Sequence, residues 1–228
     1  MKKVHAFILT LLLLIGNQSL ADYESAKRAY SENNFDLAFL LANEASQLGD
    51  LNATNLLGIL YELGLGVKKN IERAVSLYEL AAAGGQAKAN YNLGKLLLNA
   101  EQDFFDPQKG EEFLTNALEL DFLDAATDLS LAYYYGLIPG KGNADASMVA
   151  KYAAERGHIS SMKILSYLAQ SPEIRFSWLY KAAEHGDVDA IAEVGESYLW
   201  GDGVTQDVDS AILYAQKAAN LNNVHGLE

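Results

Sequence analysis

Hydrophobic positions recur along most of this chain as pairs of helical stripes, and the clearest pair lies in residues 53–89. Residues three or four positions apart share one face of a helix. The first stripe of this pair consists of Leu56, Leu57, Leu60 and Tyr61. The second stripe consists of Ala74, Leu77, Tyr78, Ala81 and Ala82. The pattern therefore predicts two amphipathic helices joined by a short connection.

Polar residues and glycines indicate where these two helices begin and end. Gly64 follows the first stripe, where a helix often ends in a left-handed residue that glycine adopts without steric cost. Gly66 keeps the connection tight, Asn70 is a suitable N-cap for the second helix, and Gly85 ends that helix. Gly58, inside the first stripe, leaves room for another helix to approach closely.

The same unit returns down the chain at a regular spacing. Gly58 is followed 36 positions later by Gly94, then by Ser130 and Ser166 at the same interval, and 29 positions later by Gly195. The fourth copy is therefore 7 residues shorter, and we expect the loss in the connection between its helices. The copies begin at Ala53, Ala89, Ala125, Ser161 and Ala190, and residues 22–52 form a shorter helix pair that precedes them.

Further helix starts can be predicted in the later copies. Asp106-Pro107 and Ser171-Pro172 each place a capping side chain before a proline that suits the first helical position. Tyr133, Tyr134 and Tyr135 are consecutive, so at least one of them must face solvent because adjacent helical residues point about 100° apart.

The first 21 residues have the pattern of a secretory signal peptide. Lys2 and Lys3 precede an apolar run, and Ser19-Leu20-Ala21 fits a small-residue cleavage site. The run is shorter than the about 20 residues of an ordinary membrane span, and an uncleaved anchor is the alternative. The chain has no cysteine, so lipid attachment at the cleavage site is excluded. These features predict a bacterial protein of the periplasm, or one released from the cell, with no membrane insertion after cleavage.

Charge narrows the classes of partner. The formal net charge is −13, and removal of Lys2 and Lys3 with the leader would make it −15. Such a chain repels phosphate backbones and anionic lipids, so nucleic-acid and membrane-surface binding are disfavoured. A neutral or basic partner is favoured instead.

No pattern of a catalytic, cofactor or metal site is found in the sequence. No two histidines lie three or four residues apart, and there is no thiol nucleophile or nucleophile-elbow serine. The glycine-rich segments at Gly64, Gly136 and Gly201 lack the spacing of a phosphate loop. We therefore expect no enzymatic activity, no cofactor and no metal.

Two segments resemble the Sel-one-like repeat (SLR) family, which is related to tetratricopeptide (TPR) repeats. They are LGILYELGLGVKKNIERAVSLYELAAAGG in the first copy and VGESYLWGDGVTQDVDSAILYAQKAA in the fifth. The fourth copy keeps the second-helix half of the pattern, and the second and third copies are degenerate. Residues 22–52 resemble a TPR pair, which would make residues 22–228 one continuous solenoid.

The resemblance implies an all-α, right-handed α-solenoid of antiparallel helix pairs that acts as a scaffold for a protein partner. It also implies that the first helix of each pair lines the concave face. The residues expected on that face are Asn55, Ile59, Glu62, Tyr91, Lys95, Thr127, Leu131, Tyr134, Tyr135, Lys163, Tyr167, Glu196, Leu199 and Trp200.

Several alternatives remain open at this point. Tyr134, Tyr135 and Trp200 could pack between repeats instead of binding a partner. The protein could be an adaptor or regulator in the periplasm, a secreted factor that binds a host protein, or a structural part of an envelope complex. The fold alone does not choose among these roles.

Overall fold

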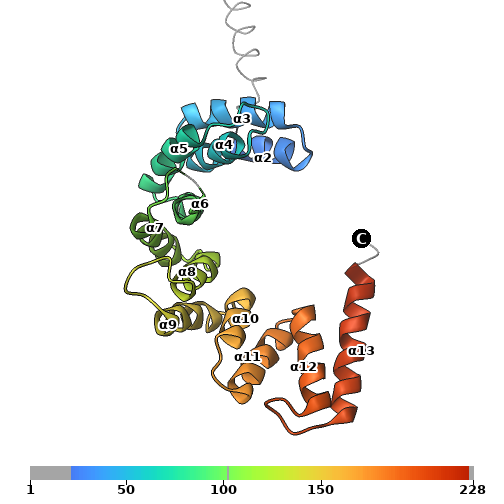
Figure 1. Cartoon of the computed structure of the whole chain (residues 1–228). Helices are drawn as coiled ribbons and strands as arrows, with labels where there is room; N and C mark the ends of the chain where they lie inside the picture. Colours follow the sequence, from blue (N-terminus) through green and yellow to red (C-terminus); the bar gives the residue numbers. More distant parts are fainter. Residues whose placement is uncertain (1–21, 102, 226–228) are drawn as a thin grey trace, which may run out of the picture. The chain divides into compact units, whose positions relative to one another are not determined.

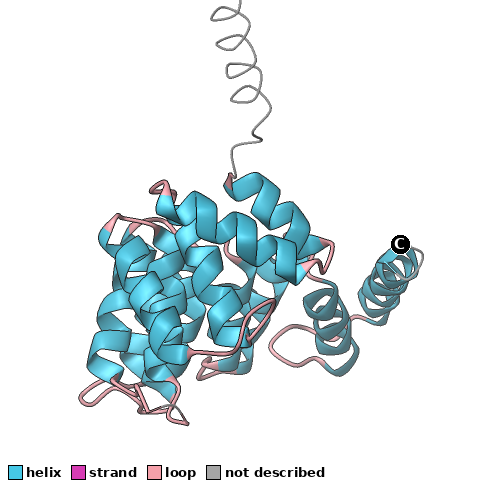
Figure 2. Ribbon diagram, turned by 90° about the horizontal axis from the view of Figure 1, so that it is seen from above, coloured by secondary structure: helices cyan, strands magenta, loops and turns pink. Residues whose placement is uncertain are grey.

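The computed structural model describes residues 22–101 and 103–225, and every regular element in these ranges is a helix (Figure 2). This confirms the predicted all-α repeat fold. The predicted signal peptide, residues 1–21, lies outside the described residues. No described helix has both the length and the apolar composition needed to cross a bilayer.

The helices follow one another in pairs, as labelled in Figure 1. Their bounds are α2 Tyr23–Ser31, α3 Phe35–Gln47, α4 Leu51–Leu63, α5 Ile71–Ala83, α6 Ala87–Leu98, α7 Pro107–Glu119, α8 Asp124–Tyr134, α9 Asn143–Ala154, α10 Ile159–Tyr167, α11 Pro172–Glu184, α12 Val188–Trp200 and α13 Val208–His225. Each predicted copy thus contains one first helix and one second helix.

The chain divides into two compact units, with the boundary in the sequence between Asn90 and Tyr91 of α6. The core of the first unit collects buried residues from α2 to α5, among them Ala26, Ala38, Leu60 and Leu77. Removing a leucine side chain such as Leu60 from water contributes roughly 1.5–3 kcal/mol. The hydrophobic stripes therefore hold the helix pairs of this unit together.

The second unit has two hydrophobic clusters. One gathers residues of α7, α8 and α9 around Leu114, Leu129 and Ala146. The other runs from α9 to α13 and includes Leu179 and Ile191. From α7 to α13, each helix packs against the next one in the chain, as expected for a stack of repeats.

Local capping interactions confirm the predicted helix starts. The side chains of Asn70 and Asp106 accept hydrogen bonds from the main-chain N–H groups of Arg73 and Lys109. Ser171 accepts one in the same way before Pro172. These bonds satisfy N–H groups that have no partner within the helix.

Gly58 and Gly64, two of the glycines given a role in the first copy, act in different ways. Gly64 ends α4 in the left-handed conformation, with a φ of 72°. At Gly58, an added Cβ would lie only 2.6 Å from Cε1 of Tyr78 on α5. The absence of a side chain therefore allows α4 and α5 to pack closely, as the sequence predicted.

The shortened fourth copy loses residues from its connection, as expected, and also from its first helix. Its first helix ends at Tyr167 and its second begins at Pro172, whereas in the third copy α8 ends at Tyr134 and α9 begins at Asn143. The connection is therefore shorter, but α10 is shorter as well, with 9 residues against 11 in α8 and 13 in α4.

Candidate functional site

Three of the predicted residues line one hollow of about 220 Å³ in the second unit. They are Lys95 on α6, Leu131 on α8 and Tyr135 just after α8, and Asp128 and Leu137 are among the other lining residues. The hollow lies between the first helices of two successive repeats. Its mixture of apolar, aromatic and charged groups suits one inserted side chain with polar contacts at the edge.

A cluster of three tyrosines adjoins this hollow through Tyr135. The ring centroid of Tyr134 lies 5.1 Å from that of Tyr135 and 5.4 Å from that of Tyr167 on α10, both in edge-to-face geometry. The hydroxyl oxygens of Tyr134 and Tyr167 are 3.4 Å apart. Tyr135 and Tyr167 remain 65% and 61% exposed. We refer to Tyr134, Tyr135 and Tyr167 as the tyrosine cluster.

Tyr133, the first of the three consecutive tyrosines, has a different environment. Its side chain is buried, and its hydroxyl donates a 2.6 Å hydrogen bond to Glu111 on α7. Burial raises the pKa of Tyr133, and the carboxylate of Glu111 raises it further. Because Tyr133 is buried and Tyr135 is exposed, the prediction that at least one of these residues faces solvent is confirmed.

Tyr91 on α6 contacts both an aromatic ring and a lysine that lines the hollow. Its ring contacts Phe122 at a centroid distance of 4.8 Å, and Nζ of Lys95 lies 5.0 Å from its ring centroid. Burial raises the pKa of Tyr91, with a further contribution from the Asp128 carboxylate. Tyr91 therefore positions Lys95 and is itself largely engaged in packing.

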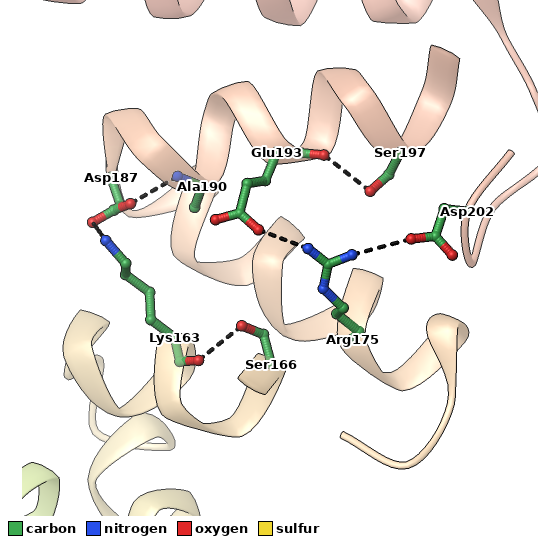
Figure 3. Close-up of polar contacts among 8 residues, drawn as sticks. All are labelled: Lys163, Ser166, Arg175, Asp187, Ala190, Glu193, Ser197 and Asp202. Carbon is green, nitrogen blue, oxygen red and sulfur yellow. Dashed lines mark hydrogen bonds and ion pairs between the residues drawn. The ribbon is translucent and has the colours of Figure 1, made fainter. Parts of the chain in front are cut away.

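Lys163 on α10 is held by two carboxylates that flank the start of α12. Its Nζ lies 3.3 Å from Asp187 and 3.0 Å from Asp189, and the pair with Asp187 is drawn in Figure 3. Burial alone would lower the pKa of Lys163, but the hydrogen bonds to the two carboxylates raise it overall. This lysine therefore connects two repeats, and the two carboxylates already compensate its positive charge.

Arg175 makes a second connection of this kind. Its guanidinium donates to Glu193 of α12 at 2.9 Å and to Asp202 in the loop after α12 at 3.0 Å (Figure 3). One arginine thus ties α11 to both the helix and the turn of the following repeat. Sequence reasoning did not select Arg175, since its two partners are 18 and 27 residues away.

The predicted residues of the last repeat lie apart from the tyrosine cluster in the chain. Glu196 and Leu199 line a second hollow, of about 370 Å³, between α12 and α13. Trp200, the last residue of α12, is 76% exposed. Tyr135 and Trp200 are therefore exposed, whereas Tyr134 is half-buried and its ring packs against Tyr167 of the next repeat, as the packing alternative has it.

In the first unit the three predicted residues differ in accessibility. Asn55 is only 3% exposed, so the structure does not place it on a displayed face. The reason is that it lies in a run of buried α4 residues packed against neighbouring helices. Ile59 is half-buried, and Glu62 accepts a 2.6 Å hydrogen bond from the hydroxyl of Tyr78.

Thr127 on α8 is half-buried, and its Oγ1 has no hydrogen-bond partner among the described residues. Asp128, which lines the first hollow, was missed. It could have been found from spacing, because Asp128, Leu131 and Tyr135 share one helical face.

The side chains of these surfaces are suited to contacts with another molecule. Within the described residues, no three histidine, aspartate or glutamate side chains are grouped so that they could hold a metal ion. The first hollow presents one cation, one carboxylate, a tyrosine and apolar side chains. Such groups can orient and bury a partner's side chain.

Comparison with known proteins identifies the family. The Sel1 repeat pattern matches residues 51–86, 87–122, 123–148, 176–187 and 188–223, which together make up more than half of the chain. In the fourth copy the match covers only second-helix residues and the turn that follows, in agreement with the shortened connection.

Solved structures show the same fold. A Sel1 repeat protein from Oxalobacter formigenes is 23% identical, with a TM-score of 0.71 over 87% of this chain and 85% of that protein. A protective antigen with an SLR fold, present in uropathogenic Escherichia coli strains, is 24% identical with a TM-score of 0.66. That alignment covers 82% of this chain and 41% of the antigen.

An immunity protein from Pseudomonas aeruginosa is more distant. It is 18% identical, with a TM-score of 0.54, and the alignment covers 87% of this chain and 82% of that protein. At these identities the structural matches establish the fold alone. The repeat matches along the sequence, together with the all-helical repeat architecture, show that this chain belongs to the Sel1 repeat family.

Proposed function

We propose that this chain is a non-catalytic scaffold or adaptor that binds a partner protein through the first helices of its second unit. Sel1 repeat proteins in general mediate protein–protein interactions. The observation that carries the proposal for this chain is the exposed tyrosine cluster beside the hollow between α6 and α8.

Exposed tyrosines favour a protein partner for a physical reason. A tyrosine ring offers a large apolar area with only two side-chain torsions to restrict, and its hydroxyl adds a hydrogen bond. The edge-to-face contacts already hold Tyr134 against both neighbours, so little conformational freedom is lost on binding. The concave side that such repeats form with their first helices is the proposed location of this surface.

The proposed partner is neutral or basic. The chain has a formal net charge of −13, so an acidic partner would be repelled over the approach distance. Asp128 at the rim of the hollow would receive a cationic side chain directly. A tyrosine face can hold the same group by a cation–π contact.

The proposed compartment is the periplasm, which rests on the signal-peptide pattern of residues 1–21. Release into the medium and binding to a host protein is the first alternative. Assembly into a large envelope complex is the second.

Photo-crosslinking capture tests the proposal. The chain starting at Asp22 would carry a photo-reactive amino acid in place of Leu137, an exposed residue at the hollow. It would be compared with the same chain bearing Tyr135→Ala and Tyr167→Ala. We expect one predominant crosslinked protein from the cell envelope, reduced at least tenfold by the double substitution.

The matched control is Tyr152→Ala, because Tyr152 is a partly exposed tyrosine on α9, the second helix of its repeat. Circular dichroism would verify that each variant is folded. If Tyr152→Ala reduced capture as much as the double substitution, the tyrosine cluster would not be the binding surface. A partner found only in culture medium would favour the secreted alternative, and co-migration with a large membrane complex would favour the structural one.

A further inference from the structure

The last described helix, α13, has an exposed apolar row. Val208 and Ile212 are 51% and 52% exposed, and Ala215 and Ala219 are also exposed. These four residues follow one another at intervals of four, three and four, the spacing of a seam that receives another helix. The buried side of α13, which includes Ala211 and Ala218, already packs in the second unit.

This row borders the hollow of about 370 Å³ between α12 and α13, which we call the α12–α13 groove. Ala192, Glu196 and Leu199 line it from α12, and Ile212, Ala215 and Ala218 line it from α13. The small side chains of α13 leave space for a second backbone to approach. The groove is separate from the hollow beside the tyrosine cluster.

The repeat register shows what covers the equivalent surface one repeat earlier. Ala215 and Ala219 lie 36 positions after Leu179 and Ala183 of α11. Leu179 and Ala183 are each only 1% exposed, and they share a hydrophobic cluster with Ile191 and other residues of α12. A first helix therefore covers on α11 the positions that remain open on α13.

Charge further restricts the occupant. Of the described residues that line the groove, only Glu196 is charged. Asp209, near the start of α13, is exposed. No described lysine or arginine lines the groove. An apolar helix that also carries lysine or arginine would complement this surface, and an acidic one would be repelled.

We propose that the α12–α13 groove binds an amphipathic, basic helix of a partner protein, which packs on α13 as α12 packs on α11. This is recognition of a helix in a groove, with apolar residues three or four positions apart as anchors. It gives the chain a second interaction surface, independent of the tyrosine cluster.

The chain itself supplies one helix of the proposed basic kind and one acidic helix for comparison. The α6 sequence AKANYNLGKLLL is a first helix with two lysines and no acidic residue, whereas the α12 sequence VDAIAEVGESYLW is a first helix with three acidic residues and no basic one. Each would be prepared as a stapled, fluorescently labelled peptide whose helicity is verified by circular dichroism. Binding to the chain starting at Asp22 would be measured by fluorescence anisotropy.

We expect the α6 peptide to bind at least tenfold more tightly than the α12 peptide, with an affinity that falls as salt rises. Ala215→Arg should weaken binding of the α6 peptide at least tenfold by filling the groove. Gln216→Arg is the matched control, because it adds the same charge at the next exposed position, which does not line the groove, and should change binding less than twofold. Glu196→Gln should reduce the salt dependence.

Three outcomes would overturn the proposal. The first is no saturable binding of the helical α6 peptide at concentrations up to about 1 mM. The second is an equal effect of the two arginine substitutions. The third is a dimer of the wild-type chain that Ala215→Arg dissociates while neither peptide binds, which would assign the groove to a second copy of the chain.

Discussion

Gly66 lies against the main-chain carbonyl oxygen of Phe35, so closely that an added Cβ would collide with it. Gly203 has the same relationship to the carbonyl oxygen of Pro172. In both cases the second glycine of a Gly-x-Gly turn contacts the first residue of the preceding repeat's second helix. The turn is thus a contact between repeats as well as a connection between helices.

This relationship predicts a large cost for Gly66→Ala. Gly66 has a φ of +66°, so alanine would add backbone strain of about 1–2 kcal/mol as well as the collision with Phe35. Gly49→Ala is the control, since Gly49 has a φ of +91° but no atom within 4 Å of an added Cβ. We expect Gly66→Ala to lower the free energy of unfolding by at least about 2 kcal/mol more than Gly49→Ala in urea denaturation. Equal costs would mean that the contact with Phe35 relaxes without penalty.

Ser130 and Ser166 occupy the same position in successive repeats but differ in hydrogen bonding. Ser130 is fully buried, and its Oγ has no partner among the described residues. Ser166 donates a 2.8 Å hydrogen bond to the carbonyl oxygen of Lys163. Removing an unsatisfied buried hydroxyl relieves a desolvation cost of about 1 kcal/mol. We expect Ser130→Ala to raise the thermal midpoint and Ser166→Ala to leave it unchanged or lower it, as measured by calorimetry.

The buried hydroxyl of Tyr78 predicts a loss of stability at alkaline pH. Burial raises the pKa of Tyr78 above its usual value, and the hydrogen bond to Glu62 raises it further. In the unfolded chain a tyrosine ionises near pH 10, so above that pH the unfolded state releases a proton that the folded state keeps. The stabilisation is therefore complete below about pH 10 and is lost as the pH rises further.

Tyr78→Phe tests this assignment. The substitution keeps the ring but removes the hydroxyl, so it should cost about 1–3 kcal/mol at pH 7 because Glu62 loses its partner. It should also make the decrease in unfolding free energy between pH 9.5 and about 11 less steep than in the wild type. An unchanged alkaline slope would assign that dependence to other buried tyrosines, such as Tyr133.

Arg175 predicts a stabilisation that depends on salt. Its ion pairs with Glu193 and Asp202 are partly exposed, and such pairs contribute at most about 1 kcal/mol each. Arg175→Ala should therefore lower the unfolding free energy by about 1–2 kcal/mol at low ionic strength and by less in 1 M salt, where screening is strong. Lys151→Ala, which removes an exposed pair with Glu155 within one helix, should have a smaller effect in the same denaturation series. The reverse order would show that Arg175 does not connect the repeats energetically.

Much of the fold could be predicted because its signals are local. The side chains of Asn70, Asp106 and Ser171 each accept a hydrogen bond from the main-chain N–H group three residues ahead. Gly64 ends α4 by its own left-handed backbone conformation. Such interactions depend on the nearest few residues, so the sequence by itself determined where helices begin and end. The constant spacing then determined that the helix pairs repeat.

The accessibility of individual side chains was decided by tertiary structure. Asn55 and Tyr135 were expected on the same kind of surface, yet one is buried and the other exposed. Helical periodicity predicts the direction in which a side chain points. It does not predict how much of that side chain the neighbouring helices bury. Exposure therefore depends on packing between residues distant in the sequence.

The contacts between repeats were likewise decided only by the tertiary structure. The pairing of Tyr134 with Tyr167, the two carboxylates around Lys163 and the closeness of Gly66 to Phe35 each join different helices. The sequence determined the repeat, its caps and its acidic charge, because each follows from composition or from neighbours along the chain. Packing of the helices determined which side chains meet and which remain exposed, because those distances exist only once the repeats have stacked.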